Sequence, residues 1–536
     1  MITAYVVFVL YLVVLLGIGW YYMNRVKTYE DFMIGGRRVG PFASSFSLVA
    51  SYMSGYTYTA APGLSYRTGY STLWWATGDA PGNSLSFGVL GRRLRRYAEA
   101  LRAITLPEYY EHRFNSPPLR VLSGLIVLIT VSMYLVAQFV AFGKLVSVMF
   151  NTSYVTGMII GSVVVIVYTF MGGYLAVVYT DVIQFSLMWL FTHVLFWTSL
   201  ALAGGFAAFN DKLAAISPAL VVPAGPDAAY GTFMAALTPI VLIIMGSFGL
   251  PHVTIRHLSL KDPRNARHAM LITAIFVVTF SFIYYMTGAL ARVLLLEPPK
   301  DVEEAGIRLW FAVLHPVFAG LMSSAAVASI MSTADSFLIL LVSTVSHDFL
   351  DRFFMPKATD EQRIKVGRYL VAVLAFLAFL VAIRPPALVF TIVIFAFGAM
   401  ALAFGVPNLF SVYWKRTTEA GVLACMILSL IVYVGATAWK WNILGLHPFM
   451  VGLIVAVVAI VVGSLLSRPP AGEPKAVFDA VGGYGDLPAA VRTHASAAVG
   501  EEIGAGIGSL RRRVPPEAIG TGVRILAPAP LPEASG

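Results

Sequence analysis

The sequence predicts an all-α protein that crosses a membrane many times. Of its 536 residues, 58% are hydrophobic and 12% are charged, whereas a soluble domain is typically about 45–50% apolar and about 25% charged. Apolar stretches of about 20 residues recur from residue 3 to residue 467, and each can cross a hydrocarbon core of about 30 Å. Because backbone polar groups cannot stay unpaired in lipid, we expect these stretches to be helices.

We predict about thirteen membrane spans. Their approximate ranges are 3–23, 41–66, 71–91, 118–148, 154–173, 175–204, 231–250, 269–296, 310–345, 369–384, 387–414, 418–438 and 447–467. The first apolar stretch follows no basic segment and has no small-residue cleavage pattern. It is therefore expected to be a retained helix rather than a signal peptide.

The loops between the spans predict their orientation. With the N-terminus outside, the inside loops are 24–40, 92–117, 251–268, 346–368 and 415–417. They carry about three times as many Lys and Arg residues as the loops on the other side, in agreement with the positive-inside rule. We therefore predict a multi-pass protein of the plasma (inner) membrane with a cytoplasmic C-terminus. Its basic loops account for the net charge of +10 without a nucleic-acid partner.

The spans also divide the chain into segments. The membrane domain, 1–467, is expected to comprise an extra N-terminal helix and loop (1–40), a first repeat (41–204), an external loop (205–230), a second repeat (231–414) and two C-terminal helices (415–467). Each repeat holds five spans, and an odd number gives the two repeats opposite orientations in the membrane. The remainder, 468–536, is rich in Ala, Gly and Pro, and we predict a disordered cytoplasmic tail.

Two spans are interrupted by helix-weakening residues, at the first position of each repeat. The second span contains Ser54, Gly55 and Pro62, and the seventh contains Gly246, Gly249 and, at its end, Pro251. Small residues in one span alone can simply allow close helix packing. Interruptions at matching positions of inverted repeats favour a transporter binding site instead.

The ninth span has hydroxyl side chains suited to a cation. Ser329, Ser332, Thr333 and Ser336 are three or four residues apart and share one helix face. Sodium is a hard cation that prefers oxygen ligands, and this face is suited to meet unwound backbone at Ala50 and Met53 in the second span. The alternative is that these hydroxyls bond carbonyls of their own helix or pack against neighbours.

Three further polar residues are candidates for the transport path. Asp181 lies near the cytoplasmic start of the sixth span, where a carboxylate either faces an interior path or sits at the interface. Tyr134 and Gln138 are one turn apart on the fourth span. They either line a solute site or form interhelical hydrogen bonds.

Nothing in the sequence predicts an enzyme. It contains no P-loop, no zinc-binding His/Glu pair and no nucleophile elbow, and its single cysteine, Cys425, cannot form a disulfide within the chain. Transport driven by an ion gradient is therefore the favoured function. A proton-coupled carrier or exchanger would need titratable groups rather than hydroxyls, and a transporter-like sensor would need a signalling domain that the short tail does not supply.

Several motifs, taken in order, resemble the sodium:solute symporter family, which includes sodium/proline, sodium/pantothenate and acetate transporters. They are Tyr29 to Arg37, Ala50 to Gly55, Tyr168 to Gly173 with Thr180 and Asp181, Gly249 to His252, and Met331 to Ser336. The resemblance covers about residues 1–467. It implies a LeuT-like core of five plus five helices in inverted repeats that works by alternating access.

The resemblance also implies binding sites. Sodium, as the transported cation, is expected at the carbonyls of Ala50, Met53 and Ser329 and the hydroxyls of Ser332 and Thr333. Some family members are similar in holding a second sodium near Ser329, Ser332, Thr333 and Asp181. The solute is expected beside the two interrupted spans, near Ser54, Tyr56, Tyr134, Gln138, Ser247 and Phe248.

The chain departs from the proline carriers at two positions. Tyr52 replaces the Asp of their Ala-Ser-Asp-Met-Ser-Gly motif, and Ile243 stands where they have an aromatic residue. The run from Tyr134 to Val140 resembles acetate and monocarboxylate carriers, while Gly249 to His252 and Phe395 to Gly398 resemble the pantothenate branch. We therefore expect sodium-coupled uptake of a small carboxylate (a monocarboxylate, pantothenate or an amino acid) by a monomer whose partners are solute, sodium and the lipid bilayer.

Overall fold

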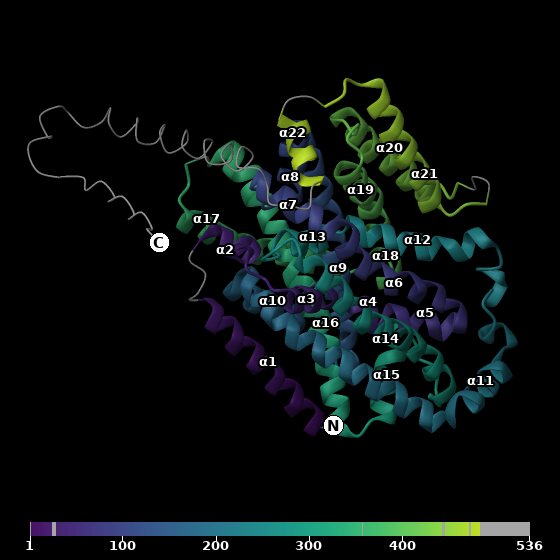
Figure 1. The fold of residues 1–536 in the computed structure, drawn as a ribbon. Coiled ribbons are helices and arrows are strands. Elements are labelled where there is room, and N and C mark those ends of the chain that lie inside the picture. Colours follow the sequence, from purple (N-terminus) through teal and green to yellow (C-terminus); the bar gives the residue numbers. More distant parts are fainter. Residues whose placement is uncertain (1, 24–27, 356, 442–444, 471–472, 483–536) are drawn as a thin grey trace, which may run out of the picture. The chain divides into compact units, whose positions relative to one another are not determined.

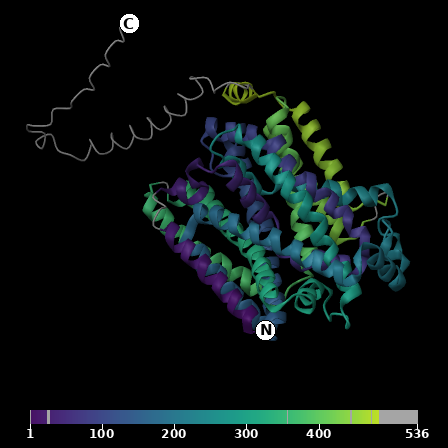
Figure 2. The same cartoon turned by 60° about the horizontal axis from the view of Figure 1, so that its bottom comes forward.

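The structure is a computed structural model that describes residues 2–23, 28–355, 357–441, 445–470 and 473–482. Within these residues the chain is helical, without a β-strand, and a lone parallel bridge joins Val39 to Leu260. Figure 1 shows the helices in chain order, and Figure 2 shows them turned by 60°.

Ten α-helices are described between residues 2 and 203. They are α1 (Ile2–Met23), α2 (Tyr29–Ile34), α3 (Pro41–Tyr52), α4 (Gly55–Tyr58), α5 (Ala60–Thr68), α6 (Leu73–Leu85), α7 (Arg92–Leu101), α8 (Leu106–Phe114), α9 (Pro117–Phe150) and α10 (Tyr154–Ala203). The longest, α10, is interrupted at Gly173, whose φ of 61° lies in the left-handed region. Glycine tolerates this conformation, so one continuous apolar run gives two helical segments at an angle.

Twelve more are described between residues 205 and 482. They are α11 (Gly205–Ile216), α12 (Phe233–Gly249), α13 (Pro251–Leu258), α14 (Asn265–Leu294), α15 (Ala305–Val313), α16 (Pro316–Ser343), α17 (Asp360–Ala382), α18 (Val389–Met400), α19 (Val406–Tyr413), α20 (Glu419–Ala438), α21 (Pro448–Leu466) and α22 (Glu473–Gly482). A π-helical segment, η7 (Thr344–Phe354), continues α16, and a second one, η8 (Ala401–Gly405), joins α18 to α19.

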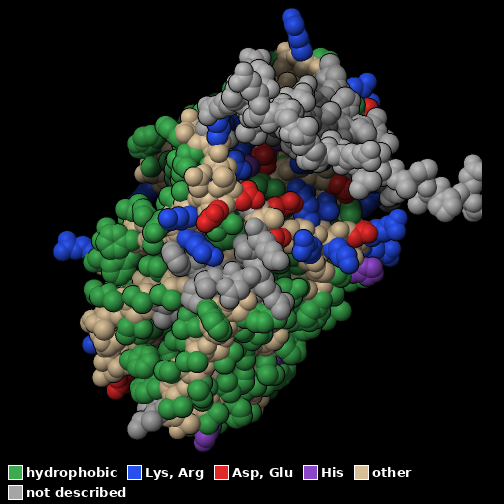
Figure 3. Space-filling model, turned by 90° about the vertical axis from the view of Figure 1, so that its left-hand side faces the viewer, with side chains coloured by type: hydrophobic (Ala, Val, Ile, Leu, Met, Phe, Trp, Pro, Cys, Tyr) green, Lys and Arg blue, Asp and Glu red, His purple; other side chains and the backbone are tan. Residues whose placement is uncertain are grey.

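Eight helices of the described chain are long and apolar enough to span a membrane, or nine if the bent pair α12–α13 counts as one span. Shorter apolar helices lie at Tyr5–Ile18 and Tyr154–Val167. Figure 3 shows hydrophobic side chains over most of the lower part of one face, with charged side chains gathered toward its upper end. The all-α, many-span prediction is confirmed, and the count of thirteen stays a prediction.

Four regions differ from the sequence expectation. The external loop 205–230 contains the helix α11, and the inside loop 251–268 begins with α13. The expected span 310–345 is two helices, α15 and α16, because Pro316 starts a new helix after the extended Leu314. The tail contains α22, on which Ala480 accepts a hydrogen bond from Arg96 of α7 at 2.8 Å. Residues 483–536, the rest of the expected disordered tail, lie outside the described residues.

The packing places α16 in the middle of the helices. Every residue in its most apolar window is buried, and it packs against α1, α3, α9 and α10. The hydroxyl face predicted on the ninth span therefore contacts protein and not lipid. Figures 1 and 2 both show α16 close to α3 and α10.

Candidate functional site

The second predicted span is broken after α3. Met53 and Ser54 have extended backbone (φ −74°, ψ 102° and φ −107°, ψ −171°), and the chain resumes as the single turn α4. The break is held against α9, because the amide of Gly55 donates to Oε1 of Gln138 at 2.9 Å. A Cβ at Gly55 would lie 2.4 Å from that of Ala141, so only glycine permits this approach. The interruption predicted from small residues is therefore a real end of a helix inside the protein.

Helix α16 supplies oxygen atoms to this break. The Ser332 hydroxyl donates to the Ala50 carbonyl at 2.8 Å and the Thr333 hydroxyl to the Ser51 carbonyl at 2.9 Å. Thr333 also lies 3.5 Å from the Met53 carbonyl and 3.0 Å from the Ser329 carbonyl. The oxygens expected to bind sodium thus lie together. The Ser51 carbonyl, which was not predicted from the sequence, belongs to the same group. Carbonyls at a helix end and hydroxyls form the type of site that holds sodium in transporters of broken helices.

Asp181 lies in a separate buried network, one turn further along α3 and α16. Its Oδ2 atom accepts from the Ser47 hydroxyl at 2.6 Å and from the Arg256 guanidinium at 3.2 Å. Arg256 also donates to the Ser336 hydroxyl at 2.8 Å, and Ser336 lies 3.4 Å from the carboxylate of Asp335. Asp181 is therefore fully buried and not interfacial. Arg256 thus pairs with Asp181 directly and is linked to Asp335 only through Ser336, and Oδ1 of Asp181 has no hydrogen-bond partner among the described residues.

A small buried cavity lies on the other side of the break. Half of its lining residues are aromatic, and the walls come from seven different helices. The lining residues are Tyr52, Met53, Tyr56, Thr57, Asp79, Tyr134, Ile243, Tyr284, Tyr285, Val393, Ile394 and Phe397. Met53 belongs to both features, since its carbonyl faces Thr333 and the residue lines the cavity. Apolar and aromatic walls with a few polar groups are typical of a small-molecule site.

The structure brings two of the six expected solute residues, Tyr56 and Tyr134, to this cavity. Ser54 contacts Tyr134 through their hydroxyls at 3.2 Å. Gln138 is engaged with the amide of Gly55, and the Ser247 hydroxyl donates to the Ile243 carbonyl of its own helix at 3.0 Å. These three, and Phe248, are not lining residues.

Asp79 is the ionisable one among the lining residues that the sequence analysis missed, which also include Thr57, Tyr284, Tyr285, Val393 and Ile394. It is buried on α6, and its carboxylate accepts hydrogen bonds from the Tyr52 hydroxyl at 2.8 Å and from the Tyr284 hydroxyl. A signal was present, because an ionisable residue within a membrane span marks a functional site more often than not. Tyr52, noticed only as a departure from the proline carriers, is the residue that reaches this carboxylate.

The matching break in the second repeat packs tightly. Helix α12 ends at Gly249, and α13 leaves it at a bend of 48°. The freed carbonyl of Phe248 accepts from the Asn408 side chain at 2.8 Å. A Cβ at Gly249 would lie 2.4 Å from the Met400 carbonyl oxygen. From the sequence, the small residues of this span indicated either an interrupted helix or close helix packing. The structure has both at this position.

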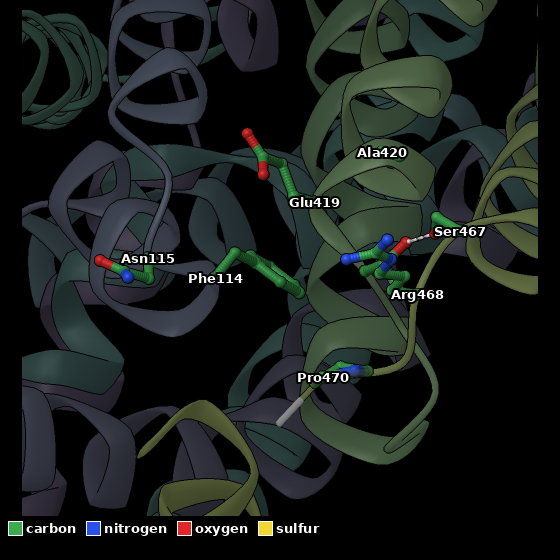
Figure 4. Close-up of a pocket in the computed structure, with 8 residues that line it drawn as sticks. Phe114, Asn115, Glu419, Ala420, Ser467, Arg468 and Pro470 are labelled. Carbon is green, nitrogen blue, oxygen red and sulfur yellow. Dashed lines mark hydrogen bonds between the residues drawn. The ribbon is translucent and has the colours of Figure 1, made fainter. Parts of the chain in front are cut away.

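A larger hollow of about 400 Å³ lies at the ends of α8, α20 and α21. Figure 4 shows Phe114 and Asn115 on one side of it and Ser467 and Arg468 on the other. None of its lining residues belongs to a helix break or to a buried polar network of α3 and α16. The buried aromatic cavity is therefore the candidate solute site.

Comparison with known proteins identifies the family. The sequence model of the "Sodium:solute symporter family" matches residues 32–429, about three quarters of the chain. The chain belongs to the sodium:solute symporter family. It is therefore a sodium-coupled secondary transporter of a small solute, with sodium as the coupling ion, and a multi-pass membrane protein rather than an enzyme.

Two family relatives align over nearly their whole length. The "Osmoregulated proline transporter OpuE" of Bacillus subtilis is 31% identical over 88% of this chain and 96% of its own. The "Sodium/proline symporter" of Escherichia coli is 31% identical over 88% of this chain and 95% of its own.

Solved structures support the fold. A sodium-coupled sialic acid symporter, 20% identical, superposes with a TM-score of 0.73 over 87% of this chain and 98% of its own. Mhp1, a nucleobase-cation-symport-1 family transporter, is 15% identical with a TM-score of 0.55 over 84% of this chain and 98% of its own. The LeuT-like fold implied by the motifs is thereby confirmed.

Proposed function

We propose that this transporter binds sodium at the break after α3 and uses it to drive inward movement of a small carboxylate-bearing solute held in the aromatic cavity. The observation that carries the proposal is the position of Met53, which contributes to both sites. A cation that pulls the Met53 carbonyl toward Thr333 changes the wall of the cavity. Sodium binding and solute binding then affect each other reciprocally, as thermodynamic linkage requires.

We propose the sodium ligands to be the carbonyl oxygens of Ala50, Met53 and Ser329 and the hydroxyl oxygens of Ser332 and Thr333. Their mutual distances support this set, since Ser332 lies 3.1 Å and Thr333 3.0 Å from the Ser329 carbonyl. Asp181 is the proposed ligand of a second sodium through its Oδ1 atom. The neighbouring Arg256 weakens such a site by repulsion, so we expect the first site to bind more tightly.

Proline is the first solute to test. The two relatives that align over nearly their full length are named as proline transporters, and proline is an amino acid with a carboxylate. Its small apolar ring matches the aromatic walls of the cavity. Tyr52 and Ile243 both line this cavity. The two departures from the proline-carrier pattern therefore lie where solute selectivity is decided, and other carboxylates belong in the same test.

In our proposal, the orientation of the chain in the bilayer follows the positive-inside rule. The N-terminus lies outside, the C-terminus lies in the cytoplasm, and the 41–204 and 231–414 segments form the two inverted repeats of a monomer. At an inside-negative potential each sodium that enters supplies about 2.3 kcal/mol per 100 mV. Tenfold accumulation of a solute requires about 1.4 kcal/mol, so one sodium is enough.

Uptake into proteoliposomes tests the function. Labelled proline, acetate, pyruvate and pantothenate are offered to the purified full chain with an inward sodium gradient or a matched potassium gradient. We expect accumulation of one of these solutes with sodium only. Equal accumulation with potassium would contradict sodium-driven symport by this chain.

A further inference from the structure

Asp79 places a carboxylate in the wall of the solute cavity, within the membrane-spanning part of the protein. It is 1% exposed, and it accepts hydrogen bonds from the hydroxyls of Tyr52 of α3 and Tyr284 of α14, with Tyr285 beside them. A carboxylate can accept about four hydrogen bonds. The tyrosines therefore leave acceptor positions on Asp79 available at the cavity.

No cationic side chain neutralises this carboxylate within the part of the chain that the structure describes. Four other buried carboxylates, Asp181, Asp348, Glu111 and Glu303, each pair with an arginine or a lysine, and Asp335 lies beside Ser336, which Arg256 contacts. Asp79 forms no such pair, and the cavity is lined by no Lys, Arg or His residue. Because an ionised group at this depth is costly without a counter-charge, the counter-charge has to come from what enters the cavity.

We propose that Asp79 binds a cationic amine of the solute, so that the transported molecule carries a primary or secondary ammonium group as well as its carboxylate. The inference rests on the proposed symport and narrows its substrate class from carboxylates to amino acids and their close analogues. Monocarboxylates and pantothenate, which lack this cation, are then poor substrates.

The walls beside Asp79 favour an organic ammonium over a second metal ion. Tyr284 and Tyr285 stack with their ring centroids 4.4 Å apart, and the rings of Tyr52 and Phe397 meet edge to face at 5.9 Å. Aromatic faces attract organic cations and also cover the apolar part of a solute. Sodium needs several oxygen ligands, and the Tyr56 and Tyr285 hydroxyls are already engaged with each other at 3.1 Å.

Matched pairs of solutes that differ in one group test the proposal. L-Proline is compared with tetrahydro-2-furoic acid, in which an ether oxygen replaces the ring amine, and alanine is compared with propionate. Each is titrated against the detergent-purified full chain in sodium, with the thermal unfolding temperature as the readout. We expect the ammonium member of a pair to stabilise the chain at a concentration at least tenfold lower than its amine-free analogue. Equal potency within the pairs would overturn the proposal.

Substitutions then test whether Asp79 causes the preference for the ammonium member of each pair. In Asp79→Asn the preference for the ammonium member is expected to vanish, and in Asp79→Glu it is expected to persist in weakened form. Ser84→Ala is the matched control, because the Ser84 hydroxyl, on the same helix, donates to the Ala80 carbonyl of that helix at 3.2 Å. Stabilisation by sodium alone reports whether each variant is folded, since the sodium ligands lie on α3 and α16. An unchanged preference in a folded Asp79→Asn would overturn the assignment.

The outcomes separate this inference from the proposed symport. Sodium-driven uptake of tetrahydro-2-furoic acid with the same KM as proline keeps the symport and removes the role of the amine. Uptake of proline that is equal in sodium and potassium, together with a lost ammonium preference in Asp79→Asn, removes the symport and keeps Asp79 as the amine site. A variant Asp79→Asn with one sodium fewer per solute and an unchanged solute KM would make Asp79 a metal ligand and overturn the proposal.

Discussion

The hydroxyls of Ser332 and Thr333 are the side-chain atoms that α16 contributes to the break after α3. We expect the double substitution S332A/T333A to raise the sodium concentration for half-maximal uptake at least tenfold, because two of the five proposed ligand oxygens are removed. Tenfold corresponds to about 1.4 kcal/mol. The control is Ser324→Ala, whose hydroxyl bonds the Gly320 carbonyl of the same helix at 2.9 Å. An unchanged sodium requirement in the double variant would take α16 out of the site.

Arg256 is the residue on which the other buried network depends. It is 1% exposed, and its guanidinium contacts Asp181, Ser47 and Ser336. Removing one member of a buried ion pair typically costs about 3–5 kcal/mol, because the remaining charge stays buried. We therefore expect Arg256→Gln to lower the thermal unfolding temperature in detergent markedly, and a further D181N substitution to recover part of the loss.

The comparison for that measurement is Arg308→Gln. The Arg308 side chain is 43% exposed and pairs with Glu304 one turn away, and such surface pairs contribute at most about 1 kcal/mol. If Arg256→Gln unfolds at the same temperature as this control, the Asp181–Arg256 pair has no structural importance.

Single residues were predictable where local spacing determines them. The intervals between Ser329, Ser332 and Thr333 fix one helix face, and the structure has that face at the break. The role of Asp79 was not predictable in this way, because its partners Tyr52 and Tyr284 lie 27 and 205 residues away in sequence. Which helices meet around a carboxylate is decided by tertiary packing, and helix periodicity carries no information about it.

At the scale of helices, the bend between α12 and α13 depends on a close backbone contact. A Cβ at Gly249 would meet the carbonyl oxygen of Met400 at 2.4 Å, and one at Gly405 would meet that of Met245 at 2.4 Å. Backbone atoms cannot move aside as a flexible side chain does, so we expect Gly249→Ala to cost about 1–3 kcal/mol or more. The measurement is the thermal unfolding temperature, with Gly17→Ala on α1 as the control, since nothing lies within 4 Å of its Cβ. Equal unfolding temperatures would contradict the contact.

An ion-pair network joins α8, α9 and η7. His347 lies 3.1 Å from Glu108, and Arg120 bridges Glu111 at 2.8 Å and Asp348 at 2.9 Å. Burial alone raises the pKa of Glu108, but the charge and hydrogen bond of His347 outweigh it and lower this pKa from 4.5 to about 2. The carboxylate form is therefore stabilised by folding.

The sign of this shift gives a pH dependence. The stability that Glu108 contributes, on the order of 3 kcal/mol, is complete above about pH 4.5 and is lost as the pH falls toward 2. We expect Glu108→Gln to flatten the fall in unfolding temperature across this window, whereas Glu297→Gln, at an exposed position, leaves it unchanged. A curve for Glu108→Gln that parallels that of the unsubstituted protein would show that this pair does not contribute.

Helices were predictable as elements because each apolar run must satisfy its backbone within itself in lipid. Their breaks were predictable where Gly and Pro weaken them, as at Gly55 and Pro251. The short helices α11 and α22 were not, because each lies in a segment without a long apolar run. Contact with neighbours stabilises α22, where Arg113 of α8 stacks over the ring of Phe478 at 5.1 Å.

At the scale of the whole molecule, the two broken helices differ in what surrounds each break. The break in the first repeat exposes carbonyls toward α16, where hydroxyls meet them, while the break in the second repeat is closed by Asn408 and packs backbone to backbone. The pattern of paired interruptions predicted both breaks. It could not predict that hydroxyl side chains of another helix would meet the carbonyls of the first break, because this depends on which helix lies opposite each break.

The basic loops predict the orientation of the molecule in the membrane. Chemical labelling from outside the cell can measure it. In a Cys425→Ala background, which removes the buried native thiol, single cysteines are placed at the exposed positions Ala229, between α11 and α12, and Lys261, between α13 and α14. We expect a membrane-impermeant maleimide to label Ala229→Cys in intact cells and Lys261→Cys only after permeabilisation. The physical reason is the retention of Arg- and Lys-rich loops on the cytoplasmic side during insertion. The opposite labelling pattern would show that the whole chain has the inverted orientation in the membrane. Sodium moving inward would then reach the break after α3 from its other side.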